Sequence, residues 1–133
     1  MNNTQFDSEL RIPLNEHSSF SLSYLGDAFF ELWCRQKILQ RLKNRRLVHL
    51  HVVQWVRCQT QARLAQLIHP LLNVEEKTIY RQGRNSKTIS PPKHAVIKDY
   101  RAATGFECLV GYWYLEKQTK RFEELMNRSE IVE

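Results

Sequence analysis

Two acidic residues stand in apolar helical patterns, each close to glycine. Asp27 directly follows Gly26, and Glu107 lies between Gly105 and Gly111. A carboxylate among apolar residues is costly to bury unless it is paired or binds a metal. Each helical glycine costs about 1 kcal/mol relative to alanine. Two helices that approach closely through glycine faces would offset that cost and bring the two carboxylates together.

A simpler alternative is that each acid pairs with a basic residue of its own helix. Glu31 fits that alternative, because Arg35 stands four residues further along. For Asp27 and Glu107 it is weaker, since no Lys or Arg stands three or four positions from either. These two acids are therefore the candidates for a shared site.

The basic residues are concentrated in the middle of the chain. Residues 35–101 hold fifteen Lys and Arg against three acidic residues, although the whole chain of 133 residues carries a net charge of only +6. Such a concentrated positive field attracts nucleic acid, other phosphorylated ligands or acidic membranes. Solvated helix faces are the alternative explanation of a basic stretch.

The apolar spacing predicts helix after helix and no strands, hence one all-α domain over residues 1–133, with flexible tails at 1–16 and 128–133. We expect helices at 20–43, over the apolar pattern 47–71, from an Asn73/Glu76 capping box to at least Arg81, after an N-cap at Asp99, and at 117–126. The paired prolines at 91–92 predict a long loop over 86–96.

Several classes of protein are disfavoured. The three cysteines are widely spaced, which is typical of reduced thiols, and no tetrahedral zinc spacing occurs. The N-terminal residues show no secretory signal, and no apolar stretch approaches a membrane span. We expect a cytoplasmic protein that does not enter membranes.

The ordered motifs resemble the ribonuclease III family. The segment 24–28 resembles its signature helix, and 105–115 its second acidic helix. The match to the Mini-ribonuclease III branch, a catalytic domain without a double-stranded-RNA-binding domain, also includes 80–87, the loop at Pro92-Lys93 and 99–105. The resemblance implies a compact helical bundle of the ribonuclease III endonuclease type.

The chain departs from full-length ribonuclease III at two acidic positions. Ser23 and Thr104 stand where that family has acids, and Mini-ribonuclease III shows the same reduction. The resemblance thus implies that Asp27 and Glu107 are a catalytic, metal-binding pair that holds Mg²⁺. Replacement of Mg²⁺ by Mn²⁺ is left open. Ser23 and Thr104 are expected to hydrogen-bond the acids or the waters around the ion.

The implied activity is Mg²⁺-dependent hydrolysis of double-stranded RNA by a homodimer, with precursor large-subunit (23S) ribosomal RNA as the natural target and a ribosomal protein helper left open. The expected RNA contacts flank the proline loop: Arg81, Arg84, Asn85, Lys87, Lys93, Lys98 and Arg101. Two alternatives stay open. One is an inert RNA-binding or ribosome-assembly module on the same fold, and the other is an interaction protein whose basic face meets an acidic partner or membrane.

Overall fold

The computed structural model describes residues 18–86, 93 and 96–129, and within them the regular secondary structure is all helical. Six α-helices and one 3-10 turn follow one another: α2 (Ser19–Leu39), α3 (Arg45–Val56), α4 (Cys58–Ile68), η2 (His69–Leu71), α5 (Val74–Arg84), α6 (Ile97–Leu115) and α7 (Thr119–Arg128). The predicted all-α fold is confirmed. None of these helices is both long enough and apolar enough to cross a bilayer.

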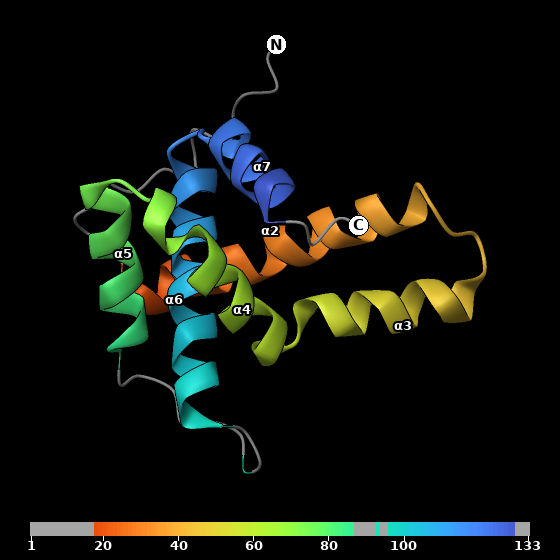
Figure 1. Ribbon diagram of the computed structural model, residues 1–133, viewed down its shortest axis with the longest axis horizontal. Helices are drawn as coiled ribbons and strands as arrows, with labels where there is room; N and C mark the ends of the chain where they lie inside the picture. The colour runs from red at the N-terminus through yellow and green to blue at the C-terminus, as the bar shows by residue number, and fades with distance from the viewer. Residues whose placement is uncertain (1–17, 87–92, 94–95, 130–133) are drawn as a thin grey trace.

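Helix α6 forms the centre of the bundle (Figure 1). It packs against α2, α4, α5 and α7, while α2 and α3 run side by side as a hairpin that extends beyond the bundle. The core is rich in aromatic rings: Phe30 of α2 meets Phe106 of α6 edge to face, with ring centres 5.1 Å apart. Phe122 brings α7 onto the same cluster, 5.3 Å from the ring of Trp33.

Local capping signals set several helix ends. Ser18 caps α2 by accepting a hydrogen bond from the backbone N–H of Ser21, and Asn44 caps α3 in the same way. The Asn73/Glu76 capping box is present at the start of α5, as predicted. The predicted N-cap at Asp99 is wrong. Helix α6 begins three residues earlier than predicted, with Val96 at the N-cap, and Asp99 lies in its first turn, where a negative charge still complements the helix dipole.

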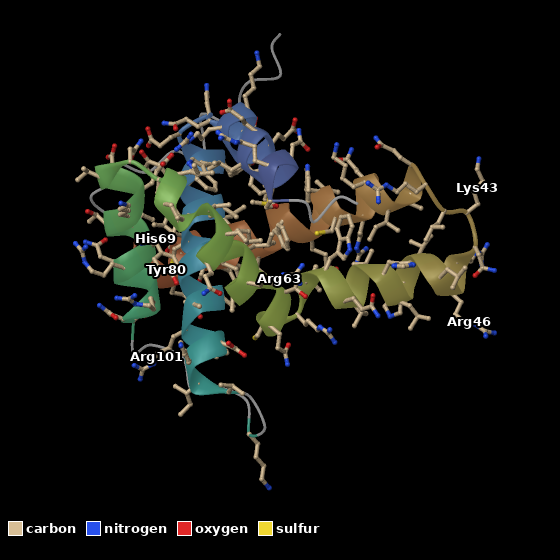
Figure 2. The ribbon with its side chains drawn as sticks, in the orientation of Figure 1. Lys43, Arg46, Arg63, His69, Tyr80 and Arg101 are labelled. Atoms are coloured by element: carbon tan, nitrogen blue, oxygen red, sulfur yellow. The ribbon has the colours of Figure 1, made fainter. Side chains whose placement is uncertain are left out.

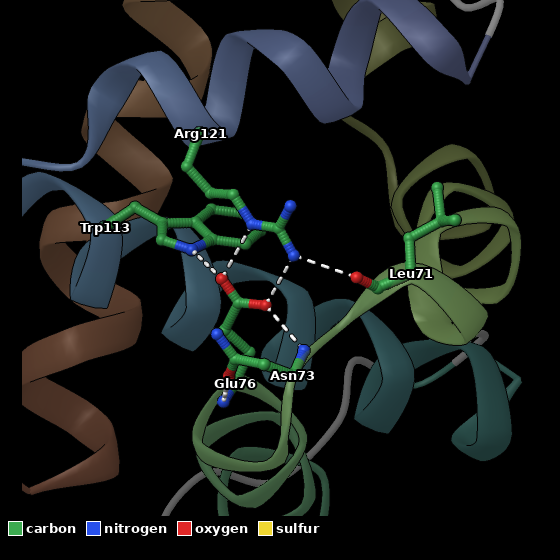
Figure 3. Close-up of polar contacts among 5 residues, drawn as sticks. All are labelled: Leu71, Asn73, Glu76, Trp113 and Arg121. Atoms are coloured by element: carbon green, nitrogen blue, oxygen red, sulfur yellow. Dashed lines mark hydrogen bonds and ion pairs between the residues drawn. The ribbon is translucent and has the colours of Figure 1, made fainter.

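Glu76 also joins three parts of the fold (Figure 3). Its buried carboxylate accepts hydrogen bonds from the Trp113 indole of α6, at 2.9 Å, and from the Arg121 guanidinium of α7, at 2.9 and 3.0 Å. Arg121 donates in turn to the Leu71 carbonyl, at 2.8 Å. Burial alone would raise the pKa of Glu76, but the hydrogen bonds from Arg121, Asn73 and Trp113 outweigh burial and lower it. This network fixes α5 and α7 against α6.

The predicted tails lie largely outside the described residues. Residues 1–16 are not described, and of the segment 128–133 only its first two residues are. Arg128 closes α7, and Ser129 is buried with its hydroxyl donating to the Met126 carbonyl, at 2.7 Å. Helix α7 thus continues to the edge of what the structure describes.

Candidate active site

The close contact between α2 and α6 runs through glycine. A side chain at Gly26 would overlap the backbone carbonyl of Glu107, and one at Gly111 would overlap the carbonyl of Leu22. Helices can approach this closely only where a Cβ is absent. The prediction of helices packed through glycine faces is therefore correct for this pair.

That contact brings Asp27 and Glu107 together. Glu107 is half-buried and Asp27 is exposed, so the pair lies at the edge of the core, open to solvent on one side. Burial raises the pKa of Glu107 to about 8, and the negative charge of Asp27 and a hydrogen bond with it act in the same direction. Two carboxylates held against each other are a ready ligand set for a cation, whose charge would offset theirs.

Three side chains that the sequence did not single out interact electrostatically with Glu107. The amide of Gln61 hydrogen-bonds to it and lowers its pKa. Burial raises the pKa of Cys58, and the negative charge of Glu107 raises it further. The pKa of Tyr100 is raised by burial, by Cys58 and by the charge of Glu107. Gln61 and Cys58 come from α4, so no local sequence signal could have joined them to Glu107. Tyr100 lies in α6, two turns before Glu107, and that helical spacing could have shown that the two share a face. The packing of α4 on α6 makes this part of the site.

Ser23 and Thr104 use their hydroxyl protons within their own helices. Ser23 is buried and donates to the Phe20 carbonyl at 3.2 Å, and Thr104 donates to the Tyr100 carbonyl at 3.0 Å. Each hydroxyl keeps lone pairs that can still accept a hydrogen bond. In this structure neither one is a donor to the carboxylates.

The described RNA-contact candidates lie at the ends of α5 and α6, except Lys93, which lies in the loop between the two helices. Arg81, Arg84, Asn85, Lys93, Lys98 and Arg101 are all exposed, whereas Lys87 and most of the 86–96 loop lie outside the described residues. Arg84 is held over the Tyr80 ring, 5.7 Å from its centre. The termini of α5 and α6 therefore present positive charge to solvent.

A cavity of about 540 Å³ connects this basic surface to α4. Arg84 and Lys98 line it together with Arg63 of α4, and Figure 2 shows Arg63 on the face of α4 turned toward the viewer, with His69 and Tyr80 beyond it between α4 and α5. We call the space bounded by Arg63, Arg84 and Lys98 the basic pocket. Asp99 is its one acidic lining residue among those described. Sequence reasoning missed Arg63, because it is distant from the other two along the chain.

Cys58 is influenced by charges of both the basic pocket and the carboxylate pair. Asp99 at the rim of the pocket and Glu107 both contribute to the raised pKa of Cys58, after burial, so that both carboxylates lie near this thiol. Lys43 and Arg46, in contrast, lie at the far end of the α2–α3 hairpin (Figure 2). Among the described residues, Arg35 is the one basic residue that lines the groove beside Asp27, and it pairs with Glu31.

The raised pKa of Glu107 predicts a pH-dependent stability in the absence of divalent metal. A glutamate ordinarily titrates near 4.5, and in the folded chain Glu107 titrates near 8. Between these values the folded protein binds one more proton than the unfolded chain, so the free energy of unfolding falls as the pH rises. Glu107→Gln removes this dependence. With EDTA present, we expect its melting temperature, relative to wild type, to rise by about 3 °C or more between pH 5 and pH 8.5.

The control for this titration is Glu31→Gln. Glu31 sits one turn from Asp27 and pairs with Arg35, as predicted. The difference in melting temperature between Glu31→Gln and wild type should be nearly the same at pH 5 and pH 8.5. If the difference in melting temperature between Glu107→Gln and wild type is also the same at both pH values, Glu107 is ionised throughout this range.

Comparisons with known proteins identify the family. Residues 21–118 match the model of the ribonuclease III domain. The chain is 37% identical over 115 residues to a Mini-ribonuclease 3 of Clostridium tetani, which covers 85% of this chain and 76% of that protein. It is 38% identical over 114 residues to a Mini-ribonuclease 3 of Thermosynechococcus vestitus, which covers 86% of this chain and 74% of the relative.

The fold agrees with this assignment. The model superposes on a crystal structure of a protein from Fusobacterium nucleatum with a TM-score of 0.78 and 29% identity, covering 86% of this chain and 92% of the other. The matched domain contains Asp27, Glu107 and all three residues of the basic pocket. The chain belongs to the ribonuclease III family of endoribonucleases, among the Mini-ribonuclease 3 proteins.

Proposed function

We propose that this protein hydrolyses phosphodiester bonds of double-stranded RNA in a reaction that depends on a divalent cation. The observation that carries the proposal is the pairing of Asp27 with Glu107 at the glycine contact of α2 and α6, in a domain of the ribonuclease III family. A purely binding surface would gain nothing from two adjacent carboxylates facing a polyanion. With a cation between carboxylate and phosphate, the same arrangement becomes favourable.

The donor set fits Mg²⁺. Asp27 and Glu107 offer only oxygen ligands, and Mg²⁺ prefers six oxygens while it keeps several waters. Within the described residues no group of three or more His, Cys, Asp or Glu could hold a metal, so waters would fill the remaining positions. Mn²⁺ suits the same ligands. Asp27 and Glu107 would hold such an ion, and the chemistry it would supply is activation of a water for attack on phosphorus and compensation of the charge that develops there. We propose that Ser23 and Thr104 support the waters through their free lone pairs.

The RNA surface is proposed to run from the carboxylate pair over the basic pocket to the ends of α5 and α6. Its residues are Arg63, Arg81, Arg84, Asn85, Lys98 and Arg101, with Lys87 and Lys93 of the loop. A-form RNA is recognised chiefly through its phosphates and 2′-hydroxyls, which suits a rigid helical surface of Lys and Arg. The charges of Asp99 in the pocket and of Glu107 both act on Cys58, which supports one continuous path for a strand.

We further propose a homodimer that cuts both strands, because one carboxylate pair supplies one site. Helix α2 supports this proposal: Phe20, Tyr24 and Leu32 are 46%, 68% and 56% exposed. Tyr24 and Leu32 line a groove on α2 together with Asp27. A two-fold interface along α2 would cover this apolar surface and place two sites on one duplex.

The natural target that we propose is precursor 23S ribosomal RNA in the cytoplasm, by analogy with the Mini-ribonuclease 3 relatives, with a ribosomal protein as a candidate helper. The first test is simpler. Purified protein is incubated with long double-stranded RNA, matched single-stranded RNA and double-stranded DNA, with Mg²⁺ or with EDTA. We expect cleavage of the double-stranded RNA alone, and only with Mg²⁺. If the protein binds RNA but does not cleave it with any of the metals tried, an inert RNA-binding module is favoured.

Loss of charge from the basic pocket should weaken RNA binding in a salt-dependent way. The variants are Arg63→Ala, Arg84→Ala and Lys98→Ala, and the measurement is the affinity for a 20-base-pair RNA with EDTA at several salt concentrations. Each variant should reduce the slope of log K against log salt by about one unit, because each lost phosphate contact releases one counterion fewer.

Lys120→Ala is the matched control for this series. Lys120 is equally exposed but belongs to α7, at the other end of the bundle from the basic pocket (Figure 1). Its slope should equal that of wild type. If the three pocket variants also keep the wild-type slope, the RNA lies on a different face.

A further inference from the structure

We propose that Gln61 is a positioning residue for Glu107: its amide holds the carboxylate in place and offers an oxygen to the hydration shell of the cation. This inference rests on the proposed function, since it requires a cation at the carboxylate pair. It deepens that function by adding α4 to a site otherwise built from α2 and α6.

The amide of Gln61 has a fixed orientation. The side chain is 1% exposed, and its Nε2 donates to the Val56 carbonyl at 2.9 Å. Val56 is the last residue of α3, where carbonyl groups have no partner within the helix. A carbonyl can only accept, so Nε2 must face Val56, and the position of Oε1 follows. The end of α3 therefore anchors the amide.

The anchored amide reaches the proposed ligand. The amide of Gln61 also interacts with the carboxyl group of Glu107, whose pKa it lowers. Because Gln61 is bound to α3 and packed against α6, it restricts the directions in which the Glu107 carboxylate can turn. Asp27 is exposed, whereas Glu107 is half-buried. A hydrogen-bonded neighbour of this kind typically fixes the orientation of a metal-binding side chain.

The remaining oxygen of Gln61 is unexplained by packing. Oε1 is fully buried and has no hydrogen-bond partner among the described residues. A buried acceptor without a partner costs about 1–3 kcal/mol, and a Met or Leu of similar size would avoid that cost. The amide is worth retaining if a ligand supplies the missing donor. Water around a cation at Glu107 is such a donor.

A purely structural role makes a different prediction, and the neighbouring residue supplies the control. Thr60 also ties α4 to the end of α3, because its Oγ1 donates to the Gln54 carbonyl at 2.6 Å. No hydrogen bond joins Thr60 to the carboxylate pair among the contacts of the described residues. Thr60→Val removes an anchor between the same two helices and leaves the surroundings of Glu107 unchanged. If Gln61 were only an anchor, the two variants would behave alike.

The test measures metal affinity without RNA. Mn²⁺ binding to the whole chain is followed by titration calorimetry for wild type, Gln61→Met, Thr60→Val and Asp27→Asn, alongside their melting temperatures. We expect about 10- to 100-fold weaker Mn²⁺ binding for Gln61→Met. Thr60→Val should bind Mn²⁺ like wild type, even where its melting temperature falls. Wild-type affinity in Gln61→Met, or an equal loss in Thr60→Val, overturns the proposal.

Two further measurements keep the outcomes separate. If Gln61→Met does not fold, the side-chain amide signals of wild-type Gln61 are followed by NMR during Mg²⁺ titration, with exposed Gln36 of α2 as reference. Gln61 should shift and Gln36 should not, and an unmoved Gln61 signal contradicts the inference. Asp27→Asn tests the underlying function: if wild type binds no Mn²⁺, or Asp27→Asn binds it equally well, the proposed cation site itself is wrong.

Discussion

Asp27→Asn and Glu107→Gln will each lower the rate of cleavage of double-stranded RNA by about 10³-fold or more, since each removes one of two anionic ligands from a cation that supplies several kcal/mol of transition-state stabilisation. Both substitutions keep the size of the side chain. The basic pocket is unchanged, so RNA affinity measured with EDTA should stay within a few-fold of wild type. The measurement is single-turnover cleavage of a labelled duplex with Mg²⁺.

Glu31→Gln is the matched control for this pair. Glu31 lies on the same helix, one turn from Asp27, and lines the same groove on α2, but its carboxylate is occupied by Arg35. We expect its cleavage rate to remain within a few-fold of wild type. Undiminished cleavage by Asp27→Asn or by Glu107→Gln would remove the corresponding carboxylate from the proposed mechanism.

The pairing of the two acids could be predicted because both signals are local. A glycine next to an acid in an apolar helix violates two preferences at once, and close helix packing explains both. The capping box of Asn73 and Glu76 is similarly local, and it forms as predicted. The second set of contacts made by Glu76 could not be predicted. The same Glu76 carboxylate binds Arg121, which lies 45 residues further along, and only the packing of α7 brings them together.

The rest of the candidate site depends on how α4 packs. Gln61, Cys58 and Arg63 carry no motif, and their roles arise because α4 lies against α6 beside Glu107. The predicted start of α6 was wrong for a related reason. Val96 has no side chain that can accept a hydrogen bond, so capping chemistry does not choose that end. Asp99 looked like an N-cap but fits equally well in the first turn.

Gly26→Ala should have the largest effect on stability, at least about 4 kcal/mol. The added Cβ would overlap the backbone carbonyl of Glu107, and backbone on both sides leaves no flexible side chain to move aside. Overpacking of a close-packed core costs about 1–3 kcal/mol even where side chains can adjust, and here two long helices must separate. Urea unfolding of the purified variant, followed by circular dichroism, measures the loss.

Gly83→Ala separates this effect from a general intolerance of alanine. Its Cβ would lie 2.6 Å from the Cys108 sulfur, a side-chain atom, and 3.0 Å from the Cα of Gly105. We expect a smaller loss of stability for Gly83→Ala than for Gly26→Ala. Gly26→Ala should also weaken Mn²⁺ binding in whatever fraction folds, because the helix separation that it forces moves Glu107 away from Asp27. A folded Gly26→Ala protein with wild-type stability and Mn²⁺ affinity would mean that the carboxylate pair does not depend on this contact.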